Sequence, residues 1–186
     1  MKKLNFNSKT INLAKPIASK ILQDTIDKLG FVPNMYSLMA NNEALLDSYA
    51  YSYHSFRENA GFSSSEQEVI FLSAAFENEC EYCMAAHSFV ADNMSNLPVE
   101  VTNAIRNAKD IEDEKLKALS LFTRSVTKNR GKVADSEVQL FLDAGYTEEH
   151  ILGVITGVGV KTFSNYFNHF ASTPLDAMFS ARKWEK

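Results

Sequence analysis

Residues 77–87 read Glu-Asn-Glu-Cys-Glu-Tyr-Cys-Met-Ala-Ala-His, and this stretch predicts both a reactive site and a break between two helices. It holds both cysteines of the chain, Cys80 and Cys83, and His87 follows the second cysteine by four residues. Since there is no third cysteine, any thiol chemistry of this protein belongs here. The polar run 77–79 interrupts an apolar helical pattern, so one helix is expected to end there and another to begin.

On one α-helix, the two cysteines and the histidine would share a face. At about 100° per residue, Cys80, Cys83 and His87 span only about 60° of the helix circumference. Cys83 and His87 are also i, i+4 neighbours, so the imidazole can exchange a proton with the thiol directly or through one water. This arrangement suits a redox dithiol, in which one thiolate attacks and the other resolves the product.

The start of the second helix is expected at Asn78. With Asn78 as N-cap, Glu81 completes a capping box and Cys80 lies in the first turn. The positive end of the helix dipole then lowers the pKa of the Cys80 thiol. Glu79 and Glu81 act in the opposite direction, because nearby negative charge favours the thiol. The sequence does not determine which of these two effects on the pKa of Cys80 is larger.

Two other interpretations of the same stretch stay open at this point. Cys80, Cys83 and His87 form a Cys2His ligand set, which zinc accepts with one open coordination position. Alternatively, the cysteines are two small buried thiols without chemistry. A lone Cys-x-x-Cys in a reducing compartment favours redox or metal chemistry over a structural staple.

The rest of the chain predicts an all-α fold, because apolar residues recur at helical spacing and no alternating strand pattern occurs. Capping residues, glycines and prolines predict helices over 17–29, 35–40, 43–59, 64–76, 79–93, 99–107, 113–128, 135–144 and 147–171. Asp135 and Thr147 are the expected caps of the last two helices. Residues 1–15 are expected to be a loose arm, and the tail from Ser172 to be irregular. One domain over 1–186 is expected, with a cysteine-bearing core at about 43–95 and a second helical half at about 99–172.

A pair of short matches predicts two degenerate helical repeats within this domain. Residues 60–63, Ala-Gly-Phe-Ser, are similar to residues 144–147, Ala-Gly-Tyr-Thr, and each segment opens an apolar helix. After a two-residue gap, a shift of 82 aligns Cys83 with Asn165 and His87 with His169. The second half is then a copy without thiols. Gly153 and Gly157, one turn apart, permit close approach of a neighbouring helix.

Composition excludes several classes of partner. The 186 residues are 45% hydrophobic and 23% charged, an ordinary globular balance. A formal net charge of −4 and the lack of a long basic run argue against nucleic acid and anionic membranes. The longest apolar run, 151–160, is about half of the roughly 20 residues that a membrane span needs. Residues 1–7 have no apolar signal-peptide core, so the cytoplasm is the expected location.

At this level the sequence resembles a known family. Glu68, Cys80, Cys83 and His87 reproduce the Glu-x11-Cys-x2-Cys-x3-His pattern of AhpD-like alkylhydroperoxidases, within the carboxymuconolactone decarboxylase superfamily. Residues 66–69 and 81–87 are similar to that family as well. The segments 30–34 and 113–116 resemble the flanks of the motif in its peroxidase-related branch. The resemblance therefore covers most of the chain.

The resemblance implies an all-helical fold and a role for each motif residue. Cys83 would attack a hydroperoxide, Cys80 would resolve it as a disulfide, and Glu68 and His87 would form the proton relay. It also implies assembly into trimers or hexamers and recycling by a thiol partner, without a cofactor. Tyr82 departs from the best-studied branch, which has a second histidine there; a tyrosine, with an ordinary pKa of about 10, is a poor proton shuttle near neutral pH.

Glu68 provides a geometric test of this function. Along an unbroken helix it would lie about 18 Å from Cys80, too far for a relay, so the function requires the helix to break and fold back. We therefore expect a thiol-disulfide oxidoreductase of peroxidase type, acting on a hydroperoxide or another small molecule. The alternatives are a decarboxylase-like enzyme acting on a small acid or lactone, and a non-enzymatic zinc-binding or assembly module.

Overall fold

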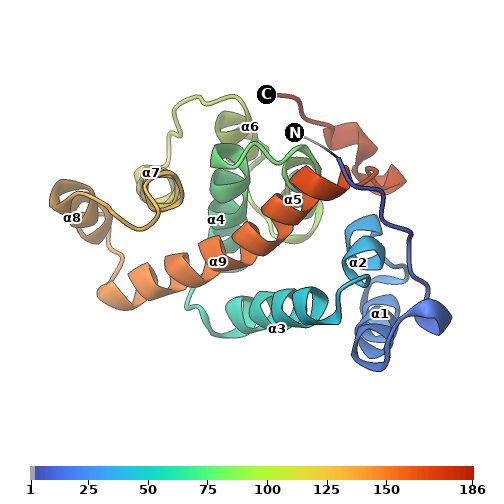
Figure 1. Cartoon of the computed structure of the whole chain (residues 1–186). Coiled ribbons are helices and arrows are strands. Elements are labelled where there is room, and N and C mark those ends of the chain that lie inside the picture. The colour runs from blue at the N-terminus through green and yellow to red at the C-terminus, as the bar shows by residue number, and fades with distance from the viewer. Residues whose placement is uncertain (1–2) are drawn as a thin grey trace.

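The chain is helical throughout the part that its structure, a computed structural model, describes, residues 3–186 (Figure 1). The helices are α1 (Pro16–Leu29), α2 (Asn34–Met39), α3 (Glu43–Asn59), α4 (Ser64–Glu77), α5 (Glu81–Met94), α6 (Val99–Arg106), α7 (Glu114–Lys128), α8 (Asp135–Asp143) and α9 (Glu148–Ala171). Two short 3-10 helices, η1 (Ile11–Leu13) and η2 (Ala177–Arg182), lie near the ends. Within these residues no strand occurs, which confirms the all-α prediction.

Side-chain caps set several helix starts where the sequence predicts them. Ser63 accepts a hydrogen bond from the Glu66 backbone N–H, and the Glu66 carboxylate accepts one from the Ser63 N–H, so α4 begins with a capping box. Thr147 caps α9 in the same way. Asp135 differs from the prediction, because it is the first residue of α8 and Ala134 precedes it as N-cap.

Both ends of the described chain pack more closely than the sequence predicts. Near the N-terminus, Phe6 stacks on Phe167 with ring centroids 5.9 Å apart. In the tail, Trp184 is buried, and its indole N–H donates to the Arg106 carbonyl at 2.9 Å. The loose arm is thus corrected, over its described residues, to a segment held against the helices. The tail is irregular as predicted, apart from η2, but it is also held against the helices.

The core is built around α4, which is buried on every side from Gln67 to Phe76. A helix that is apolar all round must be surrounded by others. Helices α5, α6, α7 and α9 pack against α4, and Figure 1 shows α9 crossing the molecule in front of it. The cysteine-bearing part and the second half therefore share this core.

Close contact between α9 and its neighbours depends on two glycines. A β-carbon on Gly157 would lie 2.7 Å from Ile70 Cγ2, and one on Gly153 would lie 2.7 Å from the Ala60 carbonyl oxygen. The expected close approach is therefore present.

The proposed repeat aligns residues 160–163 with the break that follows α4. Helix α9 runs unbroken through these residues, so the break is not repeated in the second half.

No helix within residues 3–186 combines the length and apolar character needed to cross a membrane.

Candidate active site

The predicted break lies between α4 and α5 and has the form of a Schellman motif. Asn78 is the C-cap of α4, and Glu79 has a positive φ of 54°. The Cys80 N–H donates to the Ala75 carbonyl at 3.0 Å, and the Glu79 N–H donates to the Phe76 carbonyl at 3.1 Å. The chain thus reverses within three residues, and α5 folds back along α4.

The predicted cap residue is corrected by this geometry. Asn78 ends α4 instead of starting α5, and its side chain donates to Asn165 Oδ1 on α9 at 2.9 Å. Cys80 is the N-cap of α5, so Cys83, not Cys80, lies in the first helical turn. The positive end of the α5 dipole therefore favours the thiolate of Cys83.

The fold brings Glu68 to His87. Glu68, on α4, is fully buried, and its Oε2 lies 2.9 Å from His87 Nδ1 on α5. Its other oxygen accepts from Arg57 on α3, whose guanidinium also donates to Tyr53 Oη at 2.8 Å. Three helices thus converge on one carboxylate, and the fold-back that the proposed relay requires is present.

The charge states of this pair follow from their contacts. Burial raises the pKa of Glu68, but His87 and Arg57 outweigh it and hold that pKa below its usual range. Burial and the nearby Lys161 lower the pKa of His87, against the opposing effect of Glu68. Glu68 is then a carboxylate and His87 a neutral imidazole whose Nδ1–H it accepts, which leaves Nε2 free to take a proton.

The two thiols lie beside α9. Asn168 Nδ2 on that helix donates to Cys83 Sγ at 3.3 Å and to Cys80 Sγ at 3.6 Å. Burial opposes ionisation of Cys83, but a hydrogen bond from Cys80 and the charge of Lys161 bring the pKa of Cys83 well below its ordinary value. Burial and the interaction with Cys83 raise the pKa of Cys80. The site therefore favours a Cys83 thiolate next to a Cys80 thiol.

Access from the surface is at Cys80. Both sulfur-bearing residues are almost completely buried, with 1% of Cys80 and 2% of Cys83 exposed. A cavity of about 290 Å³ is lined by Cys80, Glu79, Asn168 and His169, among others, and Cys83 is not part of its lining.

Tyr82, between the two cysteines, bonds to the C-terminal segment. Its hydroxyl donates to Asp176 Oδ2 at 2.6 Å, and the other oxygen of Asp176 accepts from the Asn34 N–H at 3.1 Å. Burial and the bond to Asp176 raise the pKa of Tyr82. Tyr82 thus ties α5 to the C-terminal segment and, through Asp176, to α2, and its hydroxyl donates to Asp176 instead of to the relay.

Sequence reasoning missed Arg57, Lys161 and Asn168. A signal for two of them is present in α9, where polar residues recur at the core-facing spacing of an otherwise apolar helix: Lys161, Ser164, Asn165 and Asn168, all buried. Arg57 has no such signal, because its partner is brought near only by packing of α3 on α4.

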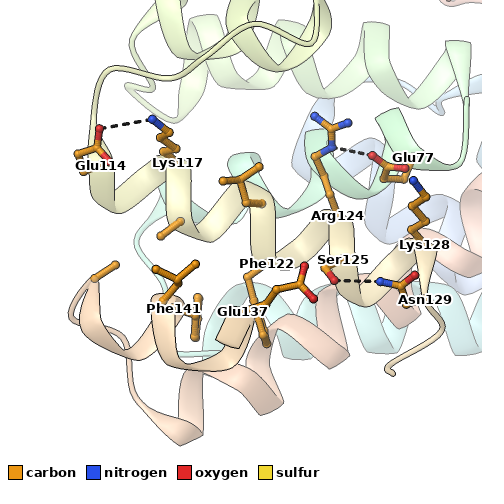
Figure 2. A pocket seen from close by; sticks show the side chains of 14 residues that line it. Glu77, Glu114, Lys117, Phe122, Arg124, Ser125, Lys128, Asn129, Glu137 and Phe141 are labelled. Carbon is orange, nitrogen blue, oxygen red and sulfur yellow. Dashed lines mark hydrogen bonds and ion pairs between the residues drawn. The ribbon is translucent and has the colours of Figure 1, made fainter. Parts of the chain in front are cut away.

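A larger cavity, about 810 Å³, lies elsewhere, between α7 and α8 (Figure 2). Phe122 and Phe141 stack at 4.3 Å along it, and Arg124 donates to Glu77 at its edge at 2.6 Å. It contains none of the four predicted site residues, so its size does not mark the chemistry.

Among residues 3–186, no three side chains of histidine, cysteine, aspartate or glutamate gather in a way that could hold a metal ion.

Comparison with known proteins rests on structure. The sequence matches no protein-family model and none of the curated proteins. An uncharacterised peroxidase-related protein with an AhpD core from Ralstonia eutropha JMP134 superposes with a TM-score of 0.82 at 20% identity, over 94% of this chain and 93% of that one. A peroxidase-related protein from Silicibacter sp. TM1040 gives 0.78 at 17% identity, over 98% of both chains.

A third similar structure is a cysteine-to-alanine variant of the debrominase Bmp8 in complex with 2,3,4-tribromopyrrole. It has a TM-score of 0.78 at 16% identity and covers 98% of this chain and 96% of that one. These likenesses extend over nearly the whole chain and share one architecture. The chain therefore has the helical fold of the AhpD-like, peroxidase-related proteins.

Proposed function

We propose that the protein is a thiol-disulfide oxidoreductase that reduces hydroperoxides through Cys83 and Cys80. The observation that carries this proposal is the Glu68–His87 hydrogen bond, 2.9 Å long, formed one helical turn from Cys83 and across the break between α4 and α5. A carboxylate that orients a neutral imidazole beside a thiol is the arrangement by which enzymes activate cysteine nucleophiles.

In the first step the Cys83 thiolate attacks one peroxide oxygen, so that an S–O bond forms and the O–O bond breaks. His87 Nε2, with its Nδ1–H held by Glu68, relays a proton from water to the departing alkoxide. The products are an alcohol and the sulfenic acid of Cys83, and the water is left as hydroxide. Cys83 is oxidised by two electrons and the peroxide is reduced by two.

In the second step the Cys80 thiol attacks the sulfenic sulfur of Cys83. An S–S bond forms, and the sulfenic hydroxyl leaves with the thiol proton as water. A partner dithiol then reduces the disulfide and is itself oxidised. The cavity at Cys80 supports attack on that sulfur, because Cys83 has the lower pKa and is the better leaving group.

The test is the loss of free thiols under hydroperoxide. The wild type should lose both thiols and form an internal disulfide; Cys83→Ser should lose none, and Cys80→Ser should stop at a sulfenic acid. If both cysteines of the wild type stay reduced under peroxide and no disulfide forms, the proposal fails.

A second electron acceptor, an aryl bromide, is proposed because the fold is that of a debrominase over nearly its full length. The same dithiol balances this reaction: an aryl bromide and two thiols give the arene, a disulfide, a proton and bromide. Bromide release from 2,3,4-tribromopyrrole by wild type but not by Cys83→Ser supports this acceptor. Absence of release, with peroxide reduction intact, leaves hydroperoxides as the substrate.

We also propose that the protein works as a homo-oligomer in the reducing cytoplasm. Exposed apolar side chains form a stripe along the solvent side of α9: Leu152, Ile155, Phe163, Tyr166 and Phe170. These residues fall within about 80° of the helix circumference, so they form one continuous face. Such a face is typical of a surface that another subunit covers.

A further inference from the structure

Lys161 is a buried cation that the proposed reaction does not yet use. It lies on α9 with none of its surface exposed. Among the residues that the structure describes, its Nζ has no hydrogen-bond partner, and it lies over the face of Phe71, with the ring centroid 5.1 Å away. The ring of His87 packs on the same Phe71 at 4.8 Å. The ammonium is therefore enclosed with the catalytic groups.

An unpaired buried ammonium is costly unless a negative charge compensates it. Arg57 and Glu68 already neutralise each other through their ion pair, and His87 is neutral. Lys161 therefore leaves this part of the core with one excess positive charge. A thiolate of the cysteine pair is the group that can cancel it.

The side of α9 that carries Lys161 is lined with further donors. Asn165, one turn later, has a buried Nδ2 without a hydrogen-bond partner within residues 3–186. Asn168, two turns later, donates its Nδ2 to Cys83 Sγ at 3.3 Å. Donors at i, i+4 and i+7 all point to one side of a helix. This side of α9 is thus built to face negative charge.

We propose that Lys161 is the counter-ion of the Cys83 thiolate and that it makes the Cys80–Cys83 disulfide a stronger oxidant. It makes no hydrogen bond to either sulfur, so it acts as a charge across the buried site, where charge interactions are weakly screened. The charge of Lys161 also favours ionisation of both thiols and lowers the pKa of each. Lys161 is a positioning residue, because it acts through Cys83.

The other titratable and charged groups around the thiols and His87 come from three helices. They are Tyr49, Tyr53 and Arg57 on α3, Glu68 on α4, and Tyr82 and His87 on α5. Burial raises the pKa of each tyrosine, so these groups stay neutral near neutral pH. The balance near Cys83 is therefore set by Glu68, Arg57 and Lys161.

The redox consequence follows from which form contains the negative charge. Reduction by glutathione converts the disulfide and two glutathione thiols into the dithiol and one glutathione disulfide. The thiolate that Lys161 stabilises exists only in the reduced form, because the disulfide has no charge. Lys161 therefore shifts this equilibrium toward the dithiol. This inference rests on the dithiol chemistry proposed above.

The experiment compares wild type, Lys161→Met and Lys161→Arg in glutathione redox buffers. Methionine keeps the length of the side chain without its charge. For Lys161→Met the equilibrium constant for reduction of the Cys80–Cys83 disulfide by glutathione should fall roughly tenfold. This corresponds to a reduction potential about 30 mV lower than that of wild type. Lys161→Arg should stay near wild type. The ultraviolet absorbance of the thiolate should appear at higher pH in Lys161→Met, and the difference in potential should vanish at a pH where both dithiols are fully protonated.

The control is Lys115→Met. Lys115 also lies over an aromatic ring, that of Tyr146, but it is half exposed and paired with Glu66 away from the thiols. The Lys115→Met substitution should leave the reduction potential and the thiolate absorbance unchanged.

Thermal unfolding separates charge from packing. Lys161→Met should stabilise the oxidised form more than the reduced form, because only the oxidised form leaves the ammonium without a counter-ion. Equal effects on both forms, or an unchanged potential in Lys161→Met and in a second neutral variant, Lys161→Gln, would overturn the proposal. Failure of any disulfide to form would instead overturn the proposed function.

Discussion

Glu68 joins three helices through its two carboxylate oxygens, one bonded to Arg57 on α3 and the other to His87 on α5. Because the residue has no exposed surface, its negative charge exists only with these partners present. A group in this position should affect both the stability of the fold and the proposed chemistry. Its removal therefore tests the site more severely than removal of an exposed acid.

For Glu68→Gln we expect a loss of both stability and peroxide-dependent disulfide formation. The amide leaves the Arg57 charge unpaired and His87 without its carboxylate, so stability should fall by about 3 kcal/mol and peroxide-dependent disulfide formation by roughly a hundredfold or more. Urea unfolding and thiol-loss kinetics measure the two effects. The matched control is Glu77→Gln on the same helix, which breaks the ion pair to Arg124 and should spare the kinetics. Equal rates in the two variants would remove Glu68 from the relay.

The pH dependence of stability follows from His87 and Glu68 together. The pKa of each is lower in the folded protein than its ordinary value, 6.5 and 4.5 respectively. Below those values the unfolded chain binds protons that the folded chain does not, so stability is complete above about pH 6.5 and decreases with acidification. Thermal unfolding between about pH 8 and 4 should show this fall.

His87→Gln should flatten the part of this fall that begins near pH 6.5, because the titrating imidazole is gone. His54→Gln is the control, since His54 is exposed on α3 and lacks the Glu68 contact. If the stability of the wild type increased as the pH is lowered from about 6.5 to 5, the charge states assigned to His87 and Glu68 would be contradicted.

At the scale of the elements, α9 offers a comparison between two of its own glycines. A methyl group on Gly157 would overlap Ile70 and Phe56, whereas nothing lies within 4 Å of one on Gly159. Gly157→Ala should therefore cost about 1–3 kcal/mol through overpacking. Gly159→Ala should gain up to about 1 kcal/mol, because alanine is the better helix former. Denaturant unfolding measures both, and equal changes would contradict the packing of α9 on α4.

Helix boundaries were predictable where a side chain makes the cap. Ser63 and Thr147 each cap a helix by bonding to a residue three positions later, so the capping pattern is local and can be recognised in the sequence. The capping pattern predicts Asn78 as the start of α5, whereas it ends α4, because a residue at a break can belong to either helix. The αL residue that ends α4 is Glu79, with no glycine there to mark it. Its conformation depends on how α5 packs, which no local pattern contains.

At the scale of the whole molecule, the apolar stripe on α9 predicts self-association. Leu152 is 64% and Ile155 53% exposed, a cost to a monomer that an interface removes. Leu152→Glu combined with Ile155→Glu should convert the proposed oligomer into monomers, as measured by light scattering during size exclusion. Tyr51→Glu, at an exposed position on α3, is the control and should leave assembly intact. A monomeric wild type would contradict this prediction.

The sequence by itself determined the helical class, the dithiol with its histidine, and the need for a break before Cys80. These follow from helical periodicity and from spacings of a few residues, which a linear chain contains in full. The motif pointed to Glu68 as well, twelve residues before Cys80.

The tertiary structure alone decided the partners of that motif. Arg57 meets Glu68, Asn168 meets Cys83, and Lys161 is enclosed without a hydrogen-bond partner among residues 3–186, because α3 and α9 pack on α4 and α5 from distant parts of the chain. It also decided which thiol lies in the first turn of α5 and which faces a cavity. The charge of a buried site depends on what surrounds it in three dimensions, and spacing along one helix does not contain that information.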